Sequence, residues 1–288
     1  MLSQLSEIQT QIKDYNITVG QLTTKINELT LKIDEMTGDV VSIGKCGQNV
    51  DFVLYSDGRL LLKGTGATFD YSTDSNPSPL QNNANIKSVI VSEGMTGIGE
   101  RLFQYCDNLK TVSLPTTLTA IKKAAFLPHI DGYICHQSLN GLTELRIPER
   151  VAELGVNAFA GTAIKSVTVP SSVVTVGAMV FTECQNLETV RYSGKIISDR
   201  MFARCIRLKN LTLTKSVREI VGGCFNYCEK LTQITYEGSL ADWNAVKKNN
   251  NWDGHSNSTT ETPLTKIQCL DGYMEYVAGT KTWKEVKS

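Results

Sequence analysis

The 288-residue chain has no net charge, because its 29 lysines and arginines are balanced by 29 aspartates and glutamates. Without a basic excess it lacks the electrostatic surface that attracts duplex DNA or an anionic membrane, so we expect no nucleic-acid partner. No stretch approaches the roughly 18 apolar residues that a membrane helix requires, so we expect no membrane insertion. Residues 1–30 carry Gln, Glu, Asp and Lys throughout and lack the apolar core of a signal peptide. We therefore expect that the chain does not enter a secretory pathway on its own.

Histidine is also scarce, with three residues in the chain. His129 and His136 fall with Cys135 in an insertion, but their spacing matches no zinc pattern and no fourth ligand is evident. The motifs Gly-x-Ser-x-Gly, His-Glu-x-x-His and the Walker lysine loop are missing from the sequence. The Gly-Thr-Gly of residues 64–66 lacks the third glycine of a dinucleotide-binding loop, because Phe69 stands at that position. We therefore predict no enzymatic activity, no cofactor and no metal site.

What the chain does have, at its N-terminus, is a sustained heptad pattern over residues 1–37. Two sets of apolar positions repeat every seven residues, the second set three residues after the first, through five consecutive heptads. A period of 3.5 residues predicts a coiled coil, whereas the alternative, a single helix packed on its own domain, needs a broader apolar stripe. We predict a homo-oligomer and favour a trimer over a dimer, although the heptads alone leave both open. The predicted contact residues are Leu5, Ile8, Ile12, Tyr15, Val19, Leu22, Ile26, Leu29, Ile33 and Met36.

Between residues 48 and 63 the pattern changes to that of β-strands. Residues 51–55 and 59–63 are two apolar-rich runs joined by Ser-Asp-Gly, which is the turn chemistry of a β-hairpin. Residues 70–85 are rich in Ser, Asn, Asp and Pro and predict a polar loop. We therefore expect a small β cap in front of the following segment.

From residue 86 onward the sequence repeats itself. Seven units begin at Ile86, Leu109, Leu142, Ile164, Leu187, Leu208 and Leu231. Their spacings are 23, 33, 22, 23, 21 and 23 residues, and such a period predicts a leucine-rich solenoid in which each unit forms one coil. In the first six units a second apolar residue is followed five positions later by Phe. These pairs are Ile98 and Phe103, Ile121 and Phe126, Leu154 and Phe159, Val176 and Phe181, Ile197 and Phe202, and Ile220 and Phe225.

Each unit opens with a strand-like alternation of apolar and polar residues. In one unit Val167 and Val169 are expected to point inward, and Ser166 and Thr168 outward. Cysteine recurs three residues after the repeated Phe in four units. Three such residues in consecutive coils cannot all pair, so we interpret them as buried thiols rather than disulfides. They are Cys106, Cys184, Cys205 and Cys228.

These units resemble the BspA-type leucine-rich repeats of bacterial surface proteins, whose pattern is L-xx-V-x-[apolar]-P followed by I-G-xx-A-F-xx-C. Residues 176–186, Val-Gly-Ala-Met-Val-Phe-Thr-Glu-Cys-Gln-Asn, carry the resemblance most clearly. Residues 60–71 look like the segment that often precedes such arrays, and residues 236–272 are similar to their closing unit. The resemblance, over roughly residues 48–272, implies a binding scaffold of the kind used in adhesins, protozoan surface proteins and phage tail proteins.

We therefore predict a mainly β fold, a leucine-rich-repeat solenoid of about seven rungs with β caps, preceded by an α-helical coiled coil. Residues 1–37 form the oligomerisation stalk, and residues 38–85 form the β-hairpin cap and polar loop. Residues 86–236 form the repeats, with an insertion at 127–141, and residues 237–288 form the C-terminal capping unit and tail.

A stalk that holds several binding heads together converts weak single contacts into avidity. Our first functional prediction is therefore a receptor-binding or tail-fibre protein of a phage tail, located in the virion, which recognises a bacterial surface protein or glycan and contacts other tail proteins. The alternatives are a BspA-like adhesin on the bacterial cell surface, exported by a signal outside this chain, and a structural tail connector.

The outward strand positions, one in each coil, form the natural binding face of such a solenoid. They are Ser113, Arg146, Thr168, Arg191, Thr212 and Thr235. Loops that interrupt a repeat tend to carry recognition, which adds the insertion with Tyr133. Two tryptophans could form a sugar platform, although closing the end of the solenoid is the more frequent role. The candidate receptor contacts are Tyr133, Arg146, Thr168, Arg191, Thr212, Trp243 and Trp252.

Overall fold

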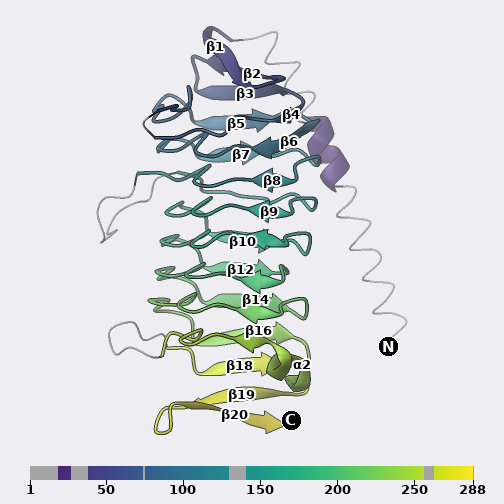
Figure 1. Ribbon diagram of the computed structural model, residues 1–288, viewed down its shortest axis with the longest axis vertical. Coiled ribbons are helices and arrows are strands. Elements are labelled where there is room, and N and C mark those ends of the chain that lie inside the picture. The colour runs from purple at the N-terminus through teal and green to yellow at the C-terminus, as the bar shows by residue number, and fades with distance from the viewer. Residues whose placement is uncertain (1–18, 27–37, 74, 130–140, 256–262, 288) are drawn as a thin grey trace.

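In the computed structural model the chain winds into a tall stack of coils (Figure 1). The structure describes residues 19–26, 38–73, 75–129, 141–255 and 263–287. Tyr133 of the insertion and seven of the ten predicted heptad contacts lie outside these residues: Leu5, Ile8, Ile12, Tyr15, Leu29, Ile33 and Met36. The coiled coil and the contact by the insertion therefore stay predictions.

Nearly every coil contributes one strand to a first face of the stack, and these strands pair in parallel. One sheet has the order β1-β2-β3-β5-β7 and the other β10-β12-β14-β16-β18-β19-β20. In β10 the predicted alternation is confirmed, because Val167 and Val169 are buried while Ser166 and Thr168 are exposed. The strands are β1 (Val40–Gly47), β2 (Val50–Tyr55), β3 (Arg59–Gly64), β5 (Ser88–Val91), β7 (Thr111–Ser113), β10 (Ser166–Val169), β12 (Thr189–Tyr192), β14 (Asn210–Thr214), β16 (Gln233–Glu237), β18 (Lys266–Cys269), β19 (Gly272–Val277) and β20 (Thr282–Lys287).

A second face carries mostly two-residue strands, which also pair in parallel. They form sheets of order β11-β9-β8-β6-β4 and β13-β15-β17. The second apolar residue of each repeat lies on this face, and all are fully buried except Val176, which is partly buried. The strands are β4 (Gly66–Ala67), β6 (Met95–Ile98), β8 (Ala120–Ile121), β9 (Glu153–Leu154), β11 (Thr175–Val176), β13 (Ile196–Ile197), β15 (Glu219–Ile220) and β17 (Lys247–Lys248).

The third side of each coil is a tight turn around the repeated phenylalanine. The residue two before it adopts a left-handed backbone conformation, and so does the residue two after it except in the coil of Phe126; their φ values lie between 50° and 70°. Amides of this turn donate to carbonyls of the next coil, as from Met179 to Asp199 (2.9 Å) and from Phe181 to Met201 (3.0 Å). The left-handed residues are Arg101, Ala124, Asn157, Met179, Arg200 and Gly223 before the Phe, and Tyr105, Gly161, Glu183, Arg204 and Tyr227 after it.

The repeated phenylalanines form one continuous stack inside the solenoid. The centroids of neighbouring rings are 5.3–6.3 Å apart, and from the second ring onward neighbouring planes lie within 4–6° of parallel. Each side chain is at most 3% exposed. Stacked aromatic pairs stabilise beyond the area that they bury, so this column couples each coil to the next. Its members are Phe103, Phe126, Phe159, Phe181, Phe202 and Phe225.

A column of buried thiols runs beside these rings. All seven cysteines in the described part of the chain are free and buried, which confirms the predicted thiol column. In three successive coils the thiol donates to the carbonyl of the phenylalanine one coil earlier: Cys184 to Phe159 (3.2 Å), Cys205 to Phe181 (3.2 Å) and Cys228 to Phe202 (3.1 Å). Burial raises the pKa of Cys184 and of Cys228 to about 12.

Antiparallel strands close both ends of the stack. At the N-terminal end the predicted hairpin of β2 and β3 is confirmed, and β1, which the sequence analysis did not predict, adds a further antiparallel strand. At the C-terminal end β19 and β20 continue the sheet antiparallel to β18. The short helix α2 (Leu240–Ala245) begins at Ser239, whose hydroxyl accepts from the Asp242 amide in a capping box.

Candidate functional site

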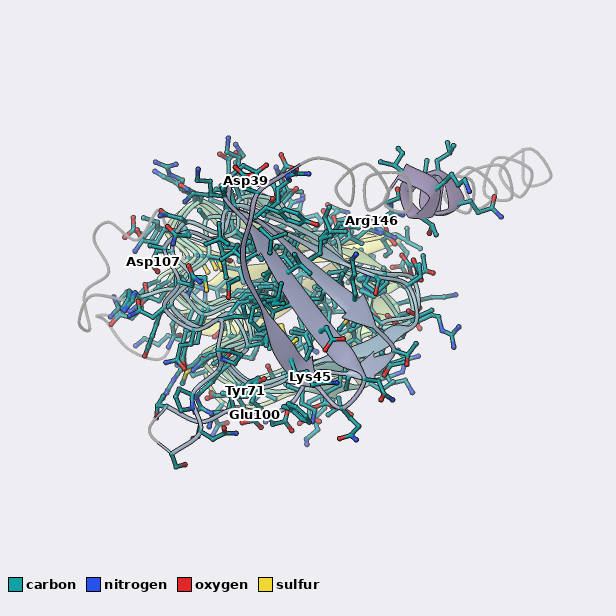
Figure 2. The ribbon with its side chains drawn as sticks, turned by 90° about the horizontal axis from the view of Figure 1, so that it is seen from above. Asp39, Lys45, Tyr71, Glu100, Asp107 and Arg146 are labelled. Atoms are coloured by element: carbon teal, nitrogen blue, oxygen red, sulfur yellow. The ribbon has the colours of Figure 1, made fainter. Side chains whose placement is uncertain are left out.

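A groove of about 1450 Å³ lies on the first face of the solenoid. One wall is the helical segment 19–26, which contributes residues 19–21, 23 and 24. The floor consists of successive first-face positions, from Val112 and Ser113 to Arg146, Thr168 and Arg191. Figure 2 shows Arg146 on the side of the stack that faces this helical segment. The groove therefore crosses several coils and is open to an extended ligand.

The first-face sheet is interrupted under this groove. Residues 142–148 form no strand, so the parallel ladder stops at β7 and resumes at β10. This coil follows the longest repeat spacing, and its Leu145 is only partly buried, whereas the equivalent Val167 and Val190 are buried. Together with Val112 and Leu114, which are also partly buried, it gives the groove an apolar floor.

Four of the predicted outward positions line the groove: Ser113, Arg146, Thr168 and Arg191. Their neighbours Thr212 and Thr235 continue the same ladder, since Thr168 pairs with Arg191, Arg191 with Thr212 and Thr212 with Thr235. These two threonines do not line the groove. The structure therefore brings four of the six predicted outward positions together in the groove.

The charged groups of the groove differ in whether they already have partners. Arg191 donates to both carboxylate oxygens of Glu237 (2.6 and 2.8 Å), a hydrogen-bonded pair that lowers the pKa of Glu237. Glu93 accepts from the amide (3.0 Å) and hydroxyl (3.1 Å) of Thr116. Arg146 and Arg150 are exposed and have no hydrogen-bond or ion-pair partner among the described residues. Two guanidinium groups are thus left for a ligand.

The helical wall presents its polar side to the solenoid. The Thr24 hydroxyl donates to Glu93 Oε1 (3.3 Å) and to the Gly20 carbonyl (3.1 Å). The three predicted heptad residues of this segment, Val19, Leu22 and Ile26, are 47%, 57% and 60% exposed. The segment is helical, as the heptads predict, and its apolar side chains remain available for another contact.

The predicted aromatic contacts at the C-terminal end need correction. Trp243 and Trp252 are 2% and 8% exposed, so neither presents a ring face to a ligand. Trp243 lies edge-on to Tyr236 (centroids 5.2 Å apart) and to Trp252 (5.6 Å), and Trp252 in turn contacts Trp283 (5.7 Å). These rings cover the apolar cross-section of the last coil, which is why they are buried.

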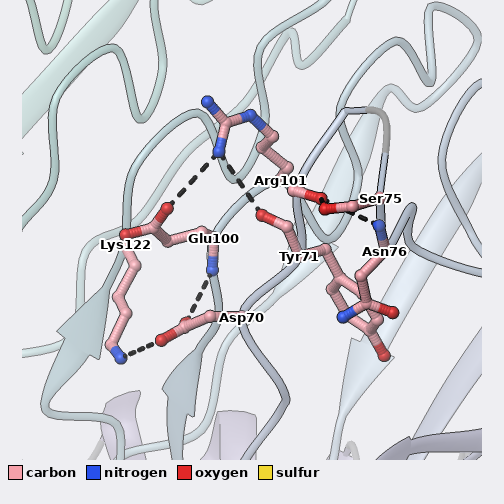
Figure 3. Close-up of polar contacts among 8 residues, drawn as sticks. Asp70, Tyr71, Ser75, Asn76, Glu100, Arg101 and Lys122 are labelled. Carbon is pink, nitrogen blue, oxygen red and sulfur yellow. Dashed lines mark hydrogen bonds and ion pairs between the residues drawn. The ribbon is translucent and has the colours of Figure 1, made fainter.

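A second polar cluster, at the N-terminal end, serves the fold (Figure 3). Asp70 accepts from Lys122 Nζ (2.7 Å) and from the Glu100 amide (3.0 Å), and these bonds outweigh its burial and lower its pKa. Arg101 donates to the Tyr71 carbonyl (3.3 Å) and contacts the Glu100 carboxylate (3.4 Å). These side chains tie the cap to the first two repeats and point to one another.

Two of the three histidines lie within the described residues, and each of them stacks on a tyrosine. His129 Nδ1 lies 2.9 Å from Asp107 Oδ2, and its ring stacks on Tyr105 at 4.2 Å. His255 stacks on Tyr276 at 3.8 Å. The described ranges hold no group of three His, Cys, Asp or Glu side chains that could bind a metal ion. Nor do they contain a helix with the length and apolarity to cross a membrane.

Residues 74–131 and 128–247 match the family model of the BspA type leucine rich repeat region, with six copies, and together span more than half of the chain. Among solved structures, the chain is similar to a leucine-rich repeat protein from Eubacterium ventriosum (20% identity, 81% of this chain and 73% of that chain, TM-score 0.49). It is also similar to one from Bacteroides ovatus (16% identity, 78% and 76%, TM-score 0.43) and to a leucine rich cell surface protein from Faecalibacterium prausnitzii (17% identity, 73% and 98%, TM-score 0.24). No curated protein matches the chain significantly.

Proposed function

Because the chain belongs to the BspA-type leucine-rich repeat family, we propose that it is a non-enzymatic binding module of a bacterial cell surface, of the adhesin type. The observation that carries this proposal is the groove, which is open, crosses several coils and is lined by exposed polar and charged side chains. The repeats supply a rigid scaffold, and the groove crosses the outer positions of several coils. The cell surface takes precedence over the phage tail because the BspA-type repeat is foremost a repeat of bacterial surface proteins.

The charges of the groove favour an acidic ligand. The charge of Arg191 is balanced by Glu237, whereas Glu93 keeps its negative charge because Thr116 is a neutral partner. Lys215, which also lines the groove, offsets the charge of Glu93. Arg146 and Arg150 leave two guanidinium groups free, and Glu149 is the one groove carboxylate for which the described residues hold no partner. A guanidinium binds a carboxylate or sulfate through two parallel hydrogen bonds.

The shape of the groove narrows the ligand class further. Its length over several coils suits a polymer better than a compact molecule, and the hydroxyls of Ser113, Ser166 and Thr168 suit the hydroxyls of a sugar chain. The apolar floor of Val112, Leu114 and Leu145 suits the apolar faces of sugar rings. We infer that the ligand is an acidic polysaccharide.

Binding of purified full-length protein to an immobilised polyuronate, with dextran as the neutral polymer, tests this proposal. The double variant Arg146→Ala/Arg150→Ala should raise the dissociation constant at least tenfold, because each lost charge-assisted contact is worth about 1.5–3 kcal/mol. The matched control Arg207→Ala/Lys230→Ala removes two exposed cations outside the groove and should change it less than twofold. Raised salt should weaken binding of the parent and the control alike.

Three outcomes would count against the proposal. Equal binding of polyuronate and dextran would exclude the acidic ligand, and equal loss in both double variants would move the site away from the groove. Antibody labelling of intact producing cells should find the protein outside the cell. Recovery with purified phage particles instead would replace the cell-surface location with the tail.

A further inference from the structure

The strand β1 is an unprotected sheet edge at the N-terminal end of the solenoid. It is the outermost strand of its sheet, and among the described residues its stretch from Val40 to Lys45 pairs on one side only, with β2. At the end of the strand, Cys46 accepts from the Phe69 amide (2.7 Å) and Gly47 forms an isolated bridge with Thr68. Its pairing is regular from Ser42 to Lys45, and the register shifts lie at Val40/Ser42 and Lys45/Gly47. Residues 40–44 read Val-Val-Ser-Ile-Gly and carry no charge. Figure 2 looks onto this end, with Asp39 and Lys45 marking the two ends of this stretch.

Exposed apolar side chains concentrate around this edge. Val40, Val41 and Ile43 are 55%, 58% and 71% exposed. With Val19, Leu22 and Ile26 of the helical segment they make up six of the ten exposed large apolar residues in the described part of the chain. Phe69, a further exposed apolar residue (45%), lies beside the end of this strand, where its amide donates to Cys46, whereas the helical segment lies beside the groove. A cluster of exposed apolar side chains on one strand marks an interaction surface.

The opposite edge of the molecule shows what a protected edge looks like in the same chain. β20 is the outermost strand at the C-terminal end, and it carries Lys284, Glu285 and Lys287. Charges on an edge strand disfavour pairing with another chain, and their absence from residues 40–44 leaves β1 competent to pair.

We propose that β1 pairs antiparallel with β1 of a second copy of this chain, around a two-fold axis. Antiparallel pairing of a strand with itself is self-complementary, so it joins two copies and leaves no open edge. When the axis lies between Ser42 and Ile43, Lys45 faces Val40 of the second copy and no like charges meet.

This arrangement specifies two copies, whereas the trimer was favoured at the level of the sequence. A three-fold axis relates three strands that cannot all pair with one another in register, so pairing of β1 specifies a dimer. The inference does not depend on the proposed function, since the groove lies on the first face and no ligand is required for pairing.

The test uses the full-length chain, light scattering over a dilution series, and hydrogen exchange of the peptide covering residues 40–47. The parent should have twice the mass of one 31.7 kDa chain. Val41→Lys/Ile43→Lys places four charges in the paired edge and should raise the dissociation constant at least tenfold while deprotecting this peptide. The control Val174→Lys, at a residue that is 50% exposed elsewhere, should leave both quantities unchanged.

The mass of three chains or of one chain for the parent would overturn the proposal. So would a double variant that dimerises as tightly as the parent and keeps the same exchange in residues 40–47, because the heptads alone would then hold the dimer. Circular dichroism of the variant shows whether it is folded. Its binding of polyuronate, measured at concentrations where it is a monomer, tests the groove separately from the pairing of β1.

Discussion

At the C-terminal end of the solenoid three tryptophans pack against one another and cover the last coil, whereas at the N-terminal end β1 exposes Val41 and Ile43. Every solenoid has an apolar cross-section at both ends that must be covered. Here one end is completed by the chain's own aromatic side chains and a charged edge strand. The other end is covered by a hairpin that leaves a further edge open. The two ends therefore differ in that one edge strand is charged, whereas the other exposes the apolar side chains that the proposed pairing of β1 would cover.

The largest expected effect is the unfolding of the whole solenoid, including both ends, when the buried thiols between the ends ionise at high pH. The pKa of Cys184 and of Cys228 is about 12 in the folded chain, against an ordinary value of 9.0. Above pH 9 the unfolded chain therefore loses these protons while the folded chain keeps them. Stability is complete below pH 9 and falls as the pH rises towards 12, by about 1.4 kcal/mol per pH unit for each thiol.

Urea unfolding at several pH values measures this loss. Both ends should unfold together, with a midpoint that falls steeply above pH 9. Cys184→Ala/Cys228→Ala should show a shallower fall, because two of the titrating thiols are gone. A parent whose midpoint is constant from pH 8 to 11 would contradict the buried thiol column.

The next largest effect is expected from a change in the centre of the phenylalanine stack, which should let the two ends unfold separately. Phe181→Ala removes a ring that stacks on Phe159 at 5.6 Å and on Phe202 at 5.7 Å, so it should cost about 3–5 kcal/mol. Phe103→Ala should cost less, because Phe103 has one stacked neighbour, Phe126. All three tryptophans lie in the C-terminal region, so their fluorescence reports that end while hydrogen exchange of β2 and β3 reports the other. Coincident transitions in Phe181→Ala would show that the coils are not coupled through the rings.

The smallest effects are expected from one substitution at each end, whose costs in stability can be compared directly. Trp243→Ala should cost about 3 kcal/mol, because it opens a cavity in the buried cover of the last coil. Ile43→Ala should change the stability of the monomer by no more than about 0.5 kcal/mol, because its side chain is 71% exposed. Chemical unfolding at low protein concentration gives both values. Equal losses would mean that the N-terminal edge is packed within one chain.

The sequence was sufficient for the repeats because each coil has the same environment. Most positions that are buried in one coil are buried in the others, so the burial of Phe181 and Cys205 could be predicted from the periodicity. The hairpin of β2 and β3 was predictable from its Asp-Gly turn, and Thr168 and Arg191 were assigned to the outer face by alternation.

The features that could not be predicted from the sequence are those that occur only once and do not follow the repeat. β1 follows the heptads without a turn signal of its own, and its bulges break the alternation that would identify a strand. The interruption at residues 142–148 has the same residue pattern as its neighbours, so Leu145 looks like any buried strand position. Trp243 and Trp252 do not recur, so only packing distinguishes a cover from a platform. The free guanidinium groups of Arg146 and Arg150 depend on which carboxylates lie near, which is a matter of tertiary structure.

The hydrogen-bond ladders on all three sides of the coils run along the axis of the stack, and this determines how the molecule responds to force. A pull between its two ends is parallel to these bonds, so they are loaded one coil at a time rather than all together. Each ordinary coil of 21–23 residues should then release roughly 70–80 Å of chain when it opens. Under tension the solenoid is a line of successive extensible links, which would yield stepwise while the remaining coils still hold their shape.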